Sequence, residues 1–208
     1  MTEQKRPLLI TTGEPAGIGM DVVLNLAAEG KLQDFDRPIW VTADASTMQV
    51  RAEELVSAGV LTEVPIWQTI DNEAGDFDMD AAEQIAQQDI DADSAFILLN
   101  VPCAGPVTGG QINIANSAMV AQQLDIAHQL AVNGTVAAIV TGPLQKSALI
   151  DAGIKLLDGT MFSGHTEFFM QQSGCEKVVM MLANQAMKVA LVTTPFAIKR
   201  HTCCHHRG

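Results

Sequence analysis

Short apolar runs alternate with longer amphipathic segments along most of this 208-residue chain, and this alternation constrains the fold more than any other feature. Parallel strands need a crossover connection of a dozen or more residues, usually a helix, whereas antiparallel strands need only a short turn. Apolar runs separated by helix-length segments are therefore typical of parallel strands joined by crossover helices. The pattern predicts an α/β fold with a parallel sheet covered by helices on both faces.

The apolar runs and periodic segments give the expected elements. On the first helix we expect Ile18, Val22, Val23 and Leu26 to lie on the buried side, because they share one face at helical spacing. The turn at 184–185 predicts an antiparallel pair that joins the sheet. The expected strands span residues 7–12, 38–43, 64–67, 96–100, 135–140, 177–182 and 187–194, and the expected helices span 18–28, 46–57 and 112–132, the last ending at Asn133 and Gly134.

The charge balance excludes several classes of partner. The 12 basic and 24 acidic residues give a net charge of -12, which repels nucleic acid and anionic membrane surfaces. The sequence shows neither an apolar run of membrane-spanning length nor a basic and then apolar N-terminus, so we expect a cytoplasmic protein. We expect its four cysteines to be reduced thiols, with Cys103 and Cys175 as packing residues.

A glycine-rich loop follows the first expected strand at residues 13–19. Its glycines permit backbone turns that side chains forbid, and the next helix offers unpaired N–H groups to a ligand. Met20 and Asp21 stand where a Walker loop requires lysine and a hydroxyl residue, and the Gly-x-Gly-x-x-Gly pattern is incomplete. Asp44 stands where a ribose-binding acid could lie. The loop is equally well interpreted as a tight strand-to-helix turn without a ligand.

Two other groups of residues are weak candidates for a metal-binding site. Nine carboxylates lie within residues 71–93, but Ala81 and Gln87 stand where a calcium loop requires glycine and glutamate, so we expect a solvated acidic surface. The segment at 201–208 contains histidines and cysteines, but its cysteines are adjacent to each other, as are two of its histidines. Adjacent side chains do not converge readily on one tetrahedral ion. We therefore expect only adventitious metal binding there.

An imidazole and a hydroxyl lie side by side at His165 and Thr166, behind Gly164. Such a pair can bind a phosphate, although Thr166 can equally cap a helix beginning near Glu167. Residues 141–143 follow a buried strand, so they are expected at the carboxyl edge of the sheet, where open α/β folds bind ligands. Lys146 can reach this crevice as a cation or stand exposed on a helix.

Five motifs, taken in order, resemble the 4-hydroxythreonine-4-phosphate dehydrogenase family of vitamin B6 biosynthesis. The resemblance runs from about Leu8 to Thr194. The motifs are residues 13–19 (GEPAGIG), 106–111 (PVTGGQ), 141–146 (TGPLQK), 164–169 (GHTEFF) and 177–183 (KVVMMLA).

The resemblance implies a three-layer αβα sandwich like that of isocitrate and isopropylmalate dehydrogenases, with two domains, the second incomplete. It implies a homodimer and the NAD-dependent oxidation and decarboxylation of 4-phosphooxy-L-threonine in pyridoxal phosphate biosynthesis. His165 and Thr166 are implied to bind this phosphorylated substrate. A divalent metal (zinc, magnesium or cobalt) is implied to stabilise the reacting oxygen.

The chain departs from the family pattern in three respects. The link at 154–161 is longer, and Pro195 stands where the family has a metal-ligand histidine. The family's two further metal histidines, additional substrate contacts and the rest of its NAD site are absent from this chain. We therefore expect a truncation or frameshift after Thr194, with a first α/β domain at 1–150, a partial second domain at 151–194 and a tail unlike the family at 195–208. The alternative is a catalytically inactive remnant that at most binds a phosphorylated small molecule.

Overall fold

The computed structural model describes residues 5–70, 91 and 93–191. Most of the acidic segment at 71–93 and the whole tail at 195–208 lie outside the described residues. Within the described ranges, no helix is long and apolar enough to cross a membrane.

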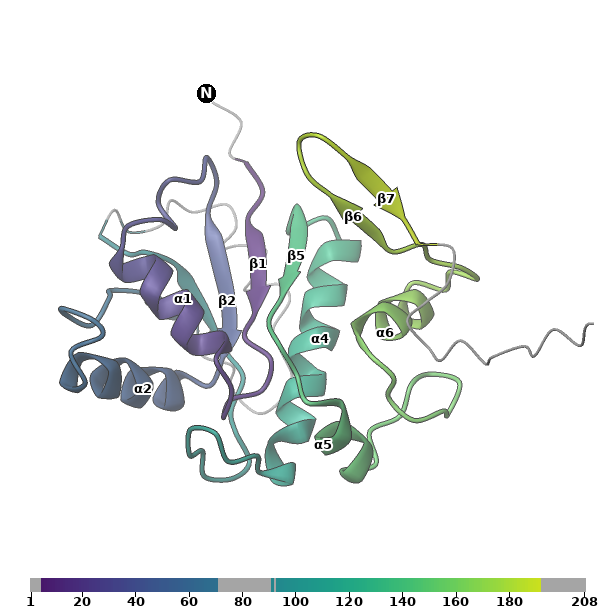
Figure 1. The fold of residues 1–208 in the computed structure, drawn as a ribbon, viewed down its shortest axis with the longest axis horizontal. Helices are drawn as coiled ribbons and strands as arrows, with labels where there is room; N and C mark the ends of the chain where they lie inside the picture. Colours follow the sequence, from purple (N-terminus) through teal and green to yellow (C-terminus); the bar gives the residue numbers. More distant parts are fainter. Residues whose placement is uncertain (1–4, 71–90, 92, 192–208) are drawn as a thin grey trace, which may run out of the picture.

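Five parallel strands form the central sheet, in the order β3-β4-β2-β1-β5. Their residues are mostly apolar or β-branched, as is typical of parallel strands. The three inner strands are largely buried, whereas the two edge strands, β3 and β5, are mostly exposed. The registers place the carboxyl ends of these strands along one edge, toward the bottom of Figure 1. The strands are β1 (Leu8–Thr11), β2 (Ile39–Ala43), β3 (Gln68–Ile70), β4 (Ile97–Asn100) and β5 (Ala138–Thr141).

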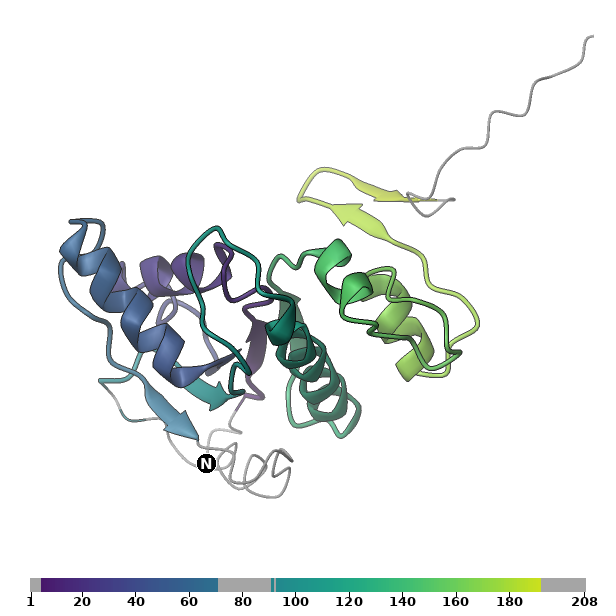
Figure 2. The same ribbon diagram turned by 90° about the horizontal axis from the view of Figure 1, so that it is seen from below.

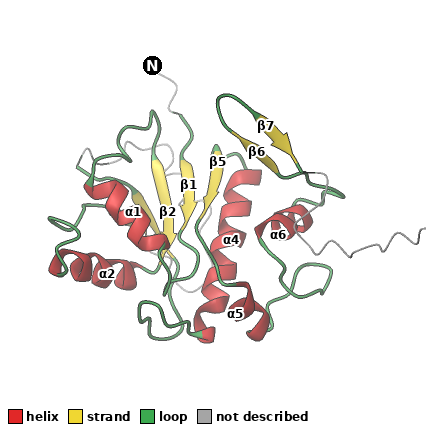
Figure 3. Ribbon diagram, viewed as in Figure 1, coloured by secondary structure: helices red, strands yellow, loops and turns green. Residues whose placement is uncertain are grey.

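Helices cover both faces of this sheet, so the expected three-layer αβα architecture is confirmed (Figures 1 and 3). Successive residues of a strand point to opposite faces. Accordingly, Ile39 and Val41 of β2 pack with the first two helices, whereas Trp40 packs with the others. The first face carries α1 (Gly19–Ala28) and α2 (Ala45–Ser57), and the second carries α4 (Ser117–Val132), α5 (Lys146–Asp151) and α6 (His165–Gln172).

The buried side of α1 matches the expected one only in part, because Val23 is buried and Leu26 packs against the core. Ile18 and Val22 are 64% and 50% exposed, whereas the side that faces the sheet is formed by Met20, Val23, Leu24 and Ala27. Ile18 precedes the first helical residue, Gly19, and apolar residues occur on several sides of this helix. The spacing of apolar residues in this segment was therefore not enough to identify which face of α1 is buried.

Two other boundaries moved by a few residues. The strand expected at 64–67 is β3 at Gln68–Ile70, because Trp67 instead stacks on Phe96 with ring centroids 5.5 Å apart. The long helix expected at 112–132 begins only at Ser117, after the 3-10 helix η2 (Ile114–Asn116). It ends as expected, since Gly134 adopts a φ of 77° directly after it.

The expected antiparallel pair forms from β6 (Met181–Ala183) and β7 (Lys188–Ala190). The Asn184 Oδ1 atom accepts hydrogen bonds from the backbone amides of Ala186 and Met187, which fixes the turn. The expectation that the pair joins the main sheet is wrong, because it forms a separate two-stranded sheet that projects from the body (Figure 2). Its strand residues are all exposed and have no core contact that would dock them.

Candidate functional site

The strand order creates a topological switch point between β1 and β5. These neighbouring strands run parallel, but the chain leaves β1 for α1 on one face and leaves β5 for α5 on the other. Where two adjacent connections diverge to opposite faces, they leave a crevice at the carboxyl ends of the strands, and open α/β proteins bind ligands there. Figure 2, which views the molecule from below, shows the loops that surround this edge.

The loop after β1 and the turn after β5 are in backbone contact. The amide of Glu14 donates to the Pro143 carbonyl over 3.0 Å, and the amide of Gly142 donates to the Thr11 carbonyl over 2.6 Å. Gly13 has a φ of +74°, and a Cβ at this position would lie 2.2 Å from the Pro143 oxygen. A glycine is therefore required at position 13 by both backbone conformation and close approach.

A buried glutamine forms hydrogen bonds with the backbone of the glycine-rich loop. Gln123 of α4 is fully buried, and its Oε1 accepts from the amide of Gly13 over 3.1 Å and from the hydroxyl of Thr42 over 3.1 Å. Its Nε2 donates to the carbonyl of Gly13 over 3.1 Å. Sequence reasoning missed this residue, although a glutamine beside the buried Val120 and Leu124 was a signal that its amide is satisfied internally.

A third loop, which carries the 106–111 motif, closes over the first. The amide of Gly110 donates to the carbonyl of Ala16 over 2.8 Å, and Thr108 and Gln111 form an isolated antiparallel bridge that tightens the loop. The first three family-like motifs, at 13–19, 106–111 and 141–146, thus meet at the carboxyl edge of the sheet.

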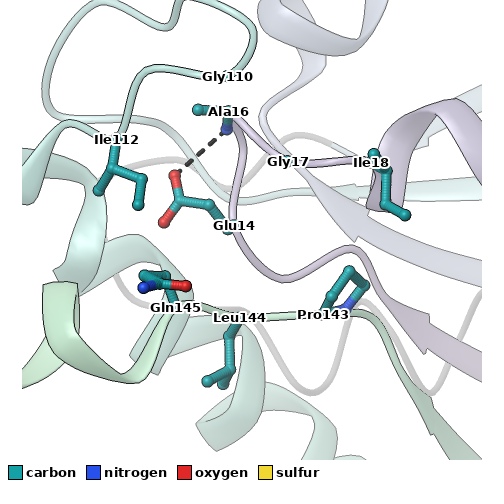
Figure 4. A pocket seen from close by; sticks show the side chains of 9 residues that line it. All are labelled: Glu14, Ala16, Gly17, Ile18, Gly110, Ile112, Pro143, Leu144 and Gln145. Atoms are coloured by element: carbon teal, nitrogen blue, oxygen red, sulfur yellow. Dashed lines mark hydrogen bonds between the residues drawn. The ribbon is translucent and has the colours of Figure 1, made fainter.

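These three loops line an open cavity of about 300 Å³. Glu14 borders it with a carboxylate that belongs to a residue only 6% exposed, and its Oε1 accepts a 3.2 Å hydrogen bond from the amide of Ala16. Figure 4 shows this carboxylate between the side chains of Ile112 and Gln145. The cavity is lined by Glu14, Ala16, Gly17, Ile18, Gly110, Ile112, Pro143, Leu144 and Gln145.

Asp44, considered above for a ribose-binding role, caps α2 in the structure. Its carboxylate caps α2, with Oδ1 accepting from the amide of Thr47 over 2.6 Å and from the hydroxyl of Ser46 over 2.7 Å, while Oδ2 accepts from the amide of Cys103 over 2.9 Å. Burial opposes its ionisation, but these hydrogen bonds lower the pKa of Asp44 overall. Both oxygens of its carboxylate thus accept hydrogen bonds from the N-terminus of α2 or from the Cys103 backbone.

His165 and Thr166 lie in the first turn of α6. Gly164 precedes them with a φ of 152° and makes no side-chain cap, and Thr166 is not the cap either. A Cβ at Gly164 would lie 3.1 Å from the Nζ of Lys146, so this cation lies beside the helix N-terminus. The 164–169 motif therefore reaches Lys146 of α5, next to the cavity-lining Gln145.

The His165 Nε2 atom is buried, and the described residues offer it no hydrogen-bond partner. Burial, and then the charge of Lys146, lower the pKa of His165. An anion placed here would oppose both effects, because its negative charge favours the imidazolium form of His165.

Cysteine and metal chemistry are limited in the described part of the chain. Cys103 is a free, half-buried thiol whose pKa is raised to about 11 by burial and by Asp44, so its expected packing role is confirmed. Cys175 is also a free thiol but is exposed, so the expectation that it packs is wrong. No group of three or more His, Cys, Asp or Glu side chains within residues 5–70, 91 and 93–191 could hold a metal ion.

A family comparison covers most of the chain. The family model described as pyridoxal phosphate biosynthetic protein PdxA matches residues 34–202. The 4-hydroxythreonine-4-phosphate dehydrogenase of Pseudoalteromonas translucida is 41% identical over 187 residues, which cover 90% of this chain and 48% of the relative. That of Serratia proteamaculans is 37% identical over 189 residues with the same coverage. The chain spans about half the length of the curated relatives it matches.

Solved structures support the fold. The crystal structure of a 4-hydroxythreonine-4-phosphate dehydrogenase from Burkholderia phymatum superposes with a TM-score of 0.69 at 23% identity, covering 94% of this chain and 52% of that one. The corresponding enzyme from Klebsiella pneumoniae gives a TM-score of 0.66 at 22% identity, covering 89% and 50%.

Proposed function

The chain belongs to the family of the pyridoxal phosphate biosynthetic protein PdxA, a family of dehydrogenases, and on this premise we propose that the whole protein oxidises and decarboxylates 4-phosphooxy-L-threonine with NAD. The product of this reaction is an intermediate of pyridoxal phosphate biosynthesis. We further propose that the protein acts in the cytoplasm as a homodimer. The expected domain division at 1–150, 151–194 and 195–208 remains a prediction.

The observation that carries the substrate assignment is the unsatisfied Nε2 of His165. A buried polar atom without a partner costs free energy, so such an atom at a helix N-terminus supports a ligand that forms a hydrogen bond with it. A phosphate accepts hydrogen bonds from an imidazole, from helix N–H groups and from a hydroxyl such as that of Thr166. The Lys146 Nζ atom lies beside the same turn, together with the carboxylate of Glu167. We therefore assign the substrate phosphate to His165 and Thr166.

The two implied cofactors differ in how they fit the described residues. NAD, when bound, supplies the hydride acceptor, and the crevice between β1 and β5 has the glycines, buried carboxylate and apolar walls that fit part of a dinucleotide. A divalent metal has no matching set of ligands among the described residues, so no step is assigned to it.

Calorimetric titration of the chain with 4-phosphooxy-L-threonine and with inorganic phosphate tests the phosphate site. We expect His165→Asn to weaken binding of both by about tenfold to a hundredfold, since a hydrogen bond to a charged group contributes about 1.5–3 kcal/mol. His128→Asn is the matched control, because His128 contacts Ser173 and lies outside the site. Equal affinities for His165→Asn and the unmodified chain would refute the phosphate assignment.

NADH formation separates the enzyme from the inactive remnant. The unmodified chain is mixed with 4-phosphooxy-L-threonine, NAD and zinc or magnesium, and NADH absorbance is followed. Turnover excludes the remnant. Substrate binding without turnover supports it, because hydride transfer in this family would then need groups that this chain does not supply.

A further inference from the structure

We propose that the cavity bordered by Glu14 binds the ribose of a nucleotide, with the Glu14 carboxylate accepting the ribose hydroxyls. This inference rests on the proposed function and deepens it, since it assigns one nucleoside half of NAD to particular residues. The 300 Å³ cavity has the volume of a small-ligand site.

The position of the cavity is the first argument. It lies at the switch point, between the loop that leaves β1 and the turn that leaves β5, and this is the place where doubly wound sheets bind nucleotides. Three loops converge there, and their backbones are fixed to one another by the bonds from Glu14 to Pro143 and from Gly110 to Ala16. A ligand would therefore meet a preformed site, with little ordering cost.

The chemistry of Glu14 is the second argument. An ionised carboxylate only accepts hydrogen bonds, so a ligand that faces Glu14 must donate them. One oxygen of this buried carboxylate accepts from the Ala16 amide, and Figure 4 shows the carboxylate group directed toward the space beside Ile112 and Gln145. Ribose hydroxyls are neutral donors, so they meet this acceptor without placing a second negative charge beside it.

The cavity walls are the third argument. Ile112 and Ile18 are 48% and 64% exposed although both line the cavity, and Pro143 and Leu144 line it as well. Exposed apolar side chains around one buried carboxylate suit a ligand that has a flat ring and a hydroxylated sugar. A compact ammonium group would satisfy Glu14 but would leave these walls in water.

Calorimetry with adenosine monophosphate, deoxyadenosine monophosphate and nicotinamide mononucleotide on the full chain tests the proposal. We expect Glu14→Gln to weaken binding of one of the two ribonucleotides about tenfold or more, because a charged acceptor is lost while shape and the bond to Ala16 are retained. A loss of affinity for adenosine monophosphate places the adenosine ribose of NAD in the cavity. A loss of affinity for nicotinamide mononucleotide places the nicotinamide ribose there. Glu63→Gln, at an exposed glutamate, is the matched control.

For the adenosine arm, a thermodynamic cycle removes any effect of misfolding. In the unmodified chain the deoxynucleotide should bind about tenfold more weakly than its ribonucleotide, and in Glu14→Gln this difference should disappear. A second variant, Ile112→Ala, should weaken both nucleotides equally, since it removes a wall and leaves the hydroxyl acceptor. If Glu14→Gln binds both ribonucleotides as the unmodified chain does, the proposal is wrong.

The outcomes also separate this proposal from the proposed function. NAD binding that is unaffected by Glu14→Gln rejects the ribose site and leaves the dehydrogenase assignment in place. Failure of NAD and both mononucleotides to bind the unmodified chain rejects the ribose site, whereas the dehydrogenase assignment of the whole protein is tested by NADH formation. Phosphate binding at His165 is measured separately and does not depend on Glu14.

Discussion

At the scale of single residues, Gln123 is expected to be the strongest determinant of the glycine-rich loop. Gln123→Ala leaves the amide and carbonyl of Gly13 and the hydroxyl of Thr42 without their buried partner. Each unsatisfied buried group costs about 1–3 kcal/mol, so we expect the loss of all three to lower the free energy of unfolding by at least about 3 kcal/mol. Urea unfolding measures it. The control is Gln129→Ala, an exposed glutamine on the same helix, which should change stability by less than about 0.5 kcal/mol.

His165 is expected to make stability and anion binding depend on pH. Its pKa lies below the ordinary 6.5 because of burial and Lys146, so between that lowered value and 6.5 the unfolded chain binds more protons than the folded chain. The contribution of His165 is therefore fully present above pH 6.5 and is lost as the pH falls through this window.

Imidazole resonances followed by NMR across the pH range measure this titration directly. Lys146→Gln should raise the pKa of His165 only part of the way to 6.5, because burial is the larger cause. Saturating phosphate should raise it further in the unmodified chain, since a bound anion stabilises the imidazolium. A His165 pKa that phosphate does not move would contradict the phosphate site.

At the scale of elements, the contact between the β1 loop and the β5 turn can be tested with two glycines of nearly equal φ. Gly13 has a φ of +74° and Gly30 a φ of +70°, but a Cβ at Gly30 meets nothing within 4 Å. Gly30→Ala should cost about 1–2 kcal/mol for its backbone conformation alone. Gly13→Ala should cost at least ~2 kcal/mol more, since its Cβ would overlap the Pro143 oxygen. Thermal unfolding of both variants gives the difference, and equal losses would show that the two loops separate readily.

The sequence predicted elements better than it predicted contacts. Strands such as β2 and β4 were located within a residue, because parallel strands buried on both faces form continuous apolar runs that end at polar residues. The buried side of α1 was predicted only in part, since Val23 and Leu26 lie at the core whereas Ile18 and Val22 are exposed. The role of Glu14 was not foreseen, because it depends on which loops meet after folding. His165 was singled out from its neighbours in sequence, but the unsatisfied state of its Nε2 required the three-dimensional packing.

At the scale of the whole molecule, the β6–β7 pair is a surface without a counterpart in the described chain. Leu182 and Val189 are directly paired across it and are 60% and 39% exposed. Exposed apolar surface of this kind typically marks a contact with another protein surface rather than a part of the core. We therefore expect the β6–β7 pair to contribute little to the free energy of unfolding of the domain that contains the five-stranded sheet. We also expect it to promote association between copies of the chain.

The double variant Leu182→Ser with Val189→Ser separates these two roles. We expect the unfolding free energy to change by less than about 0.5 kcal/mol, since neither side chain lies in a core cluster, while sedimentation velocity at rising concentration shows weaker self-association. Val50→Ser, which removes an equally exposed apolar side chain from α2, is the control and should leave association unchanged. A loss of about 2 kcal/mol in stability would mean that the hairpin packs on the body after all, because only buried apolar side chains contribute that much.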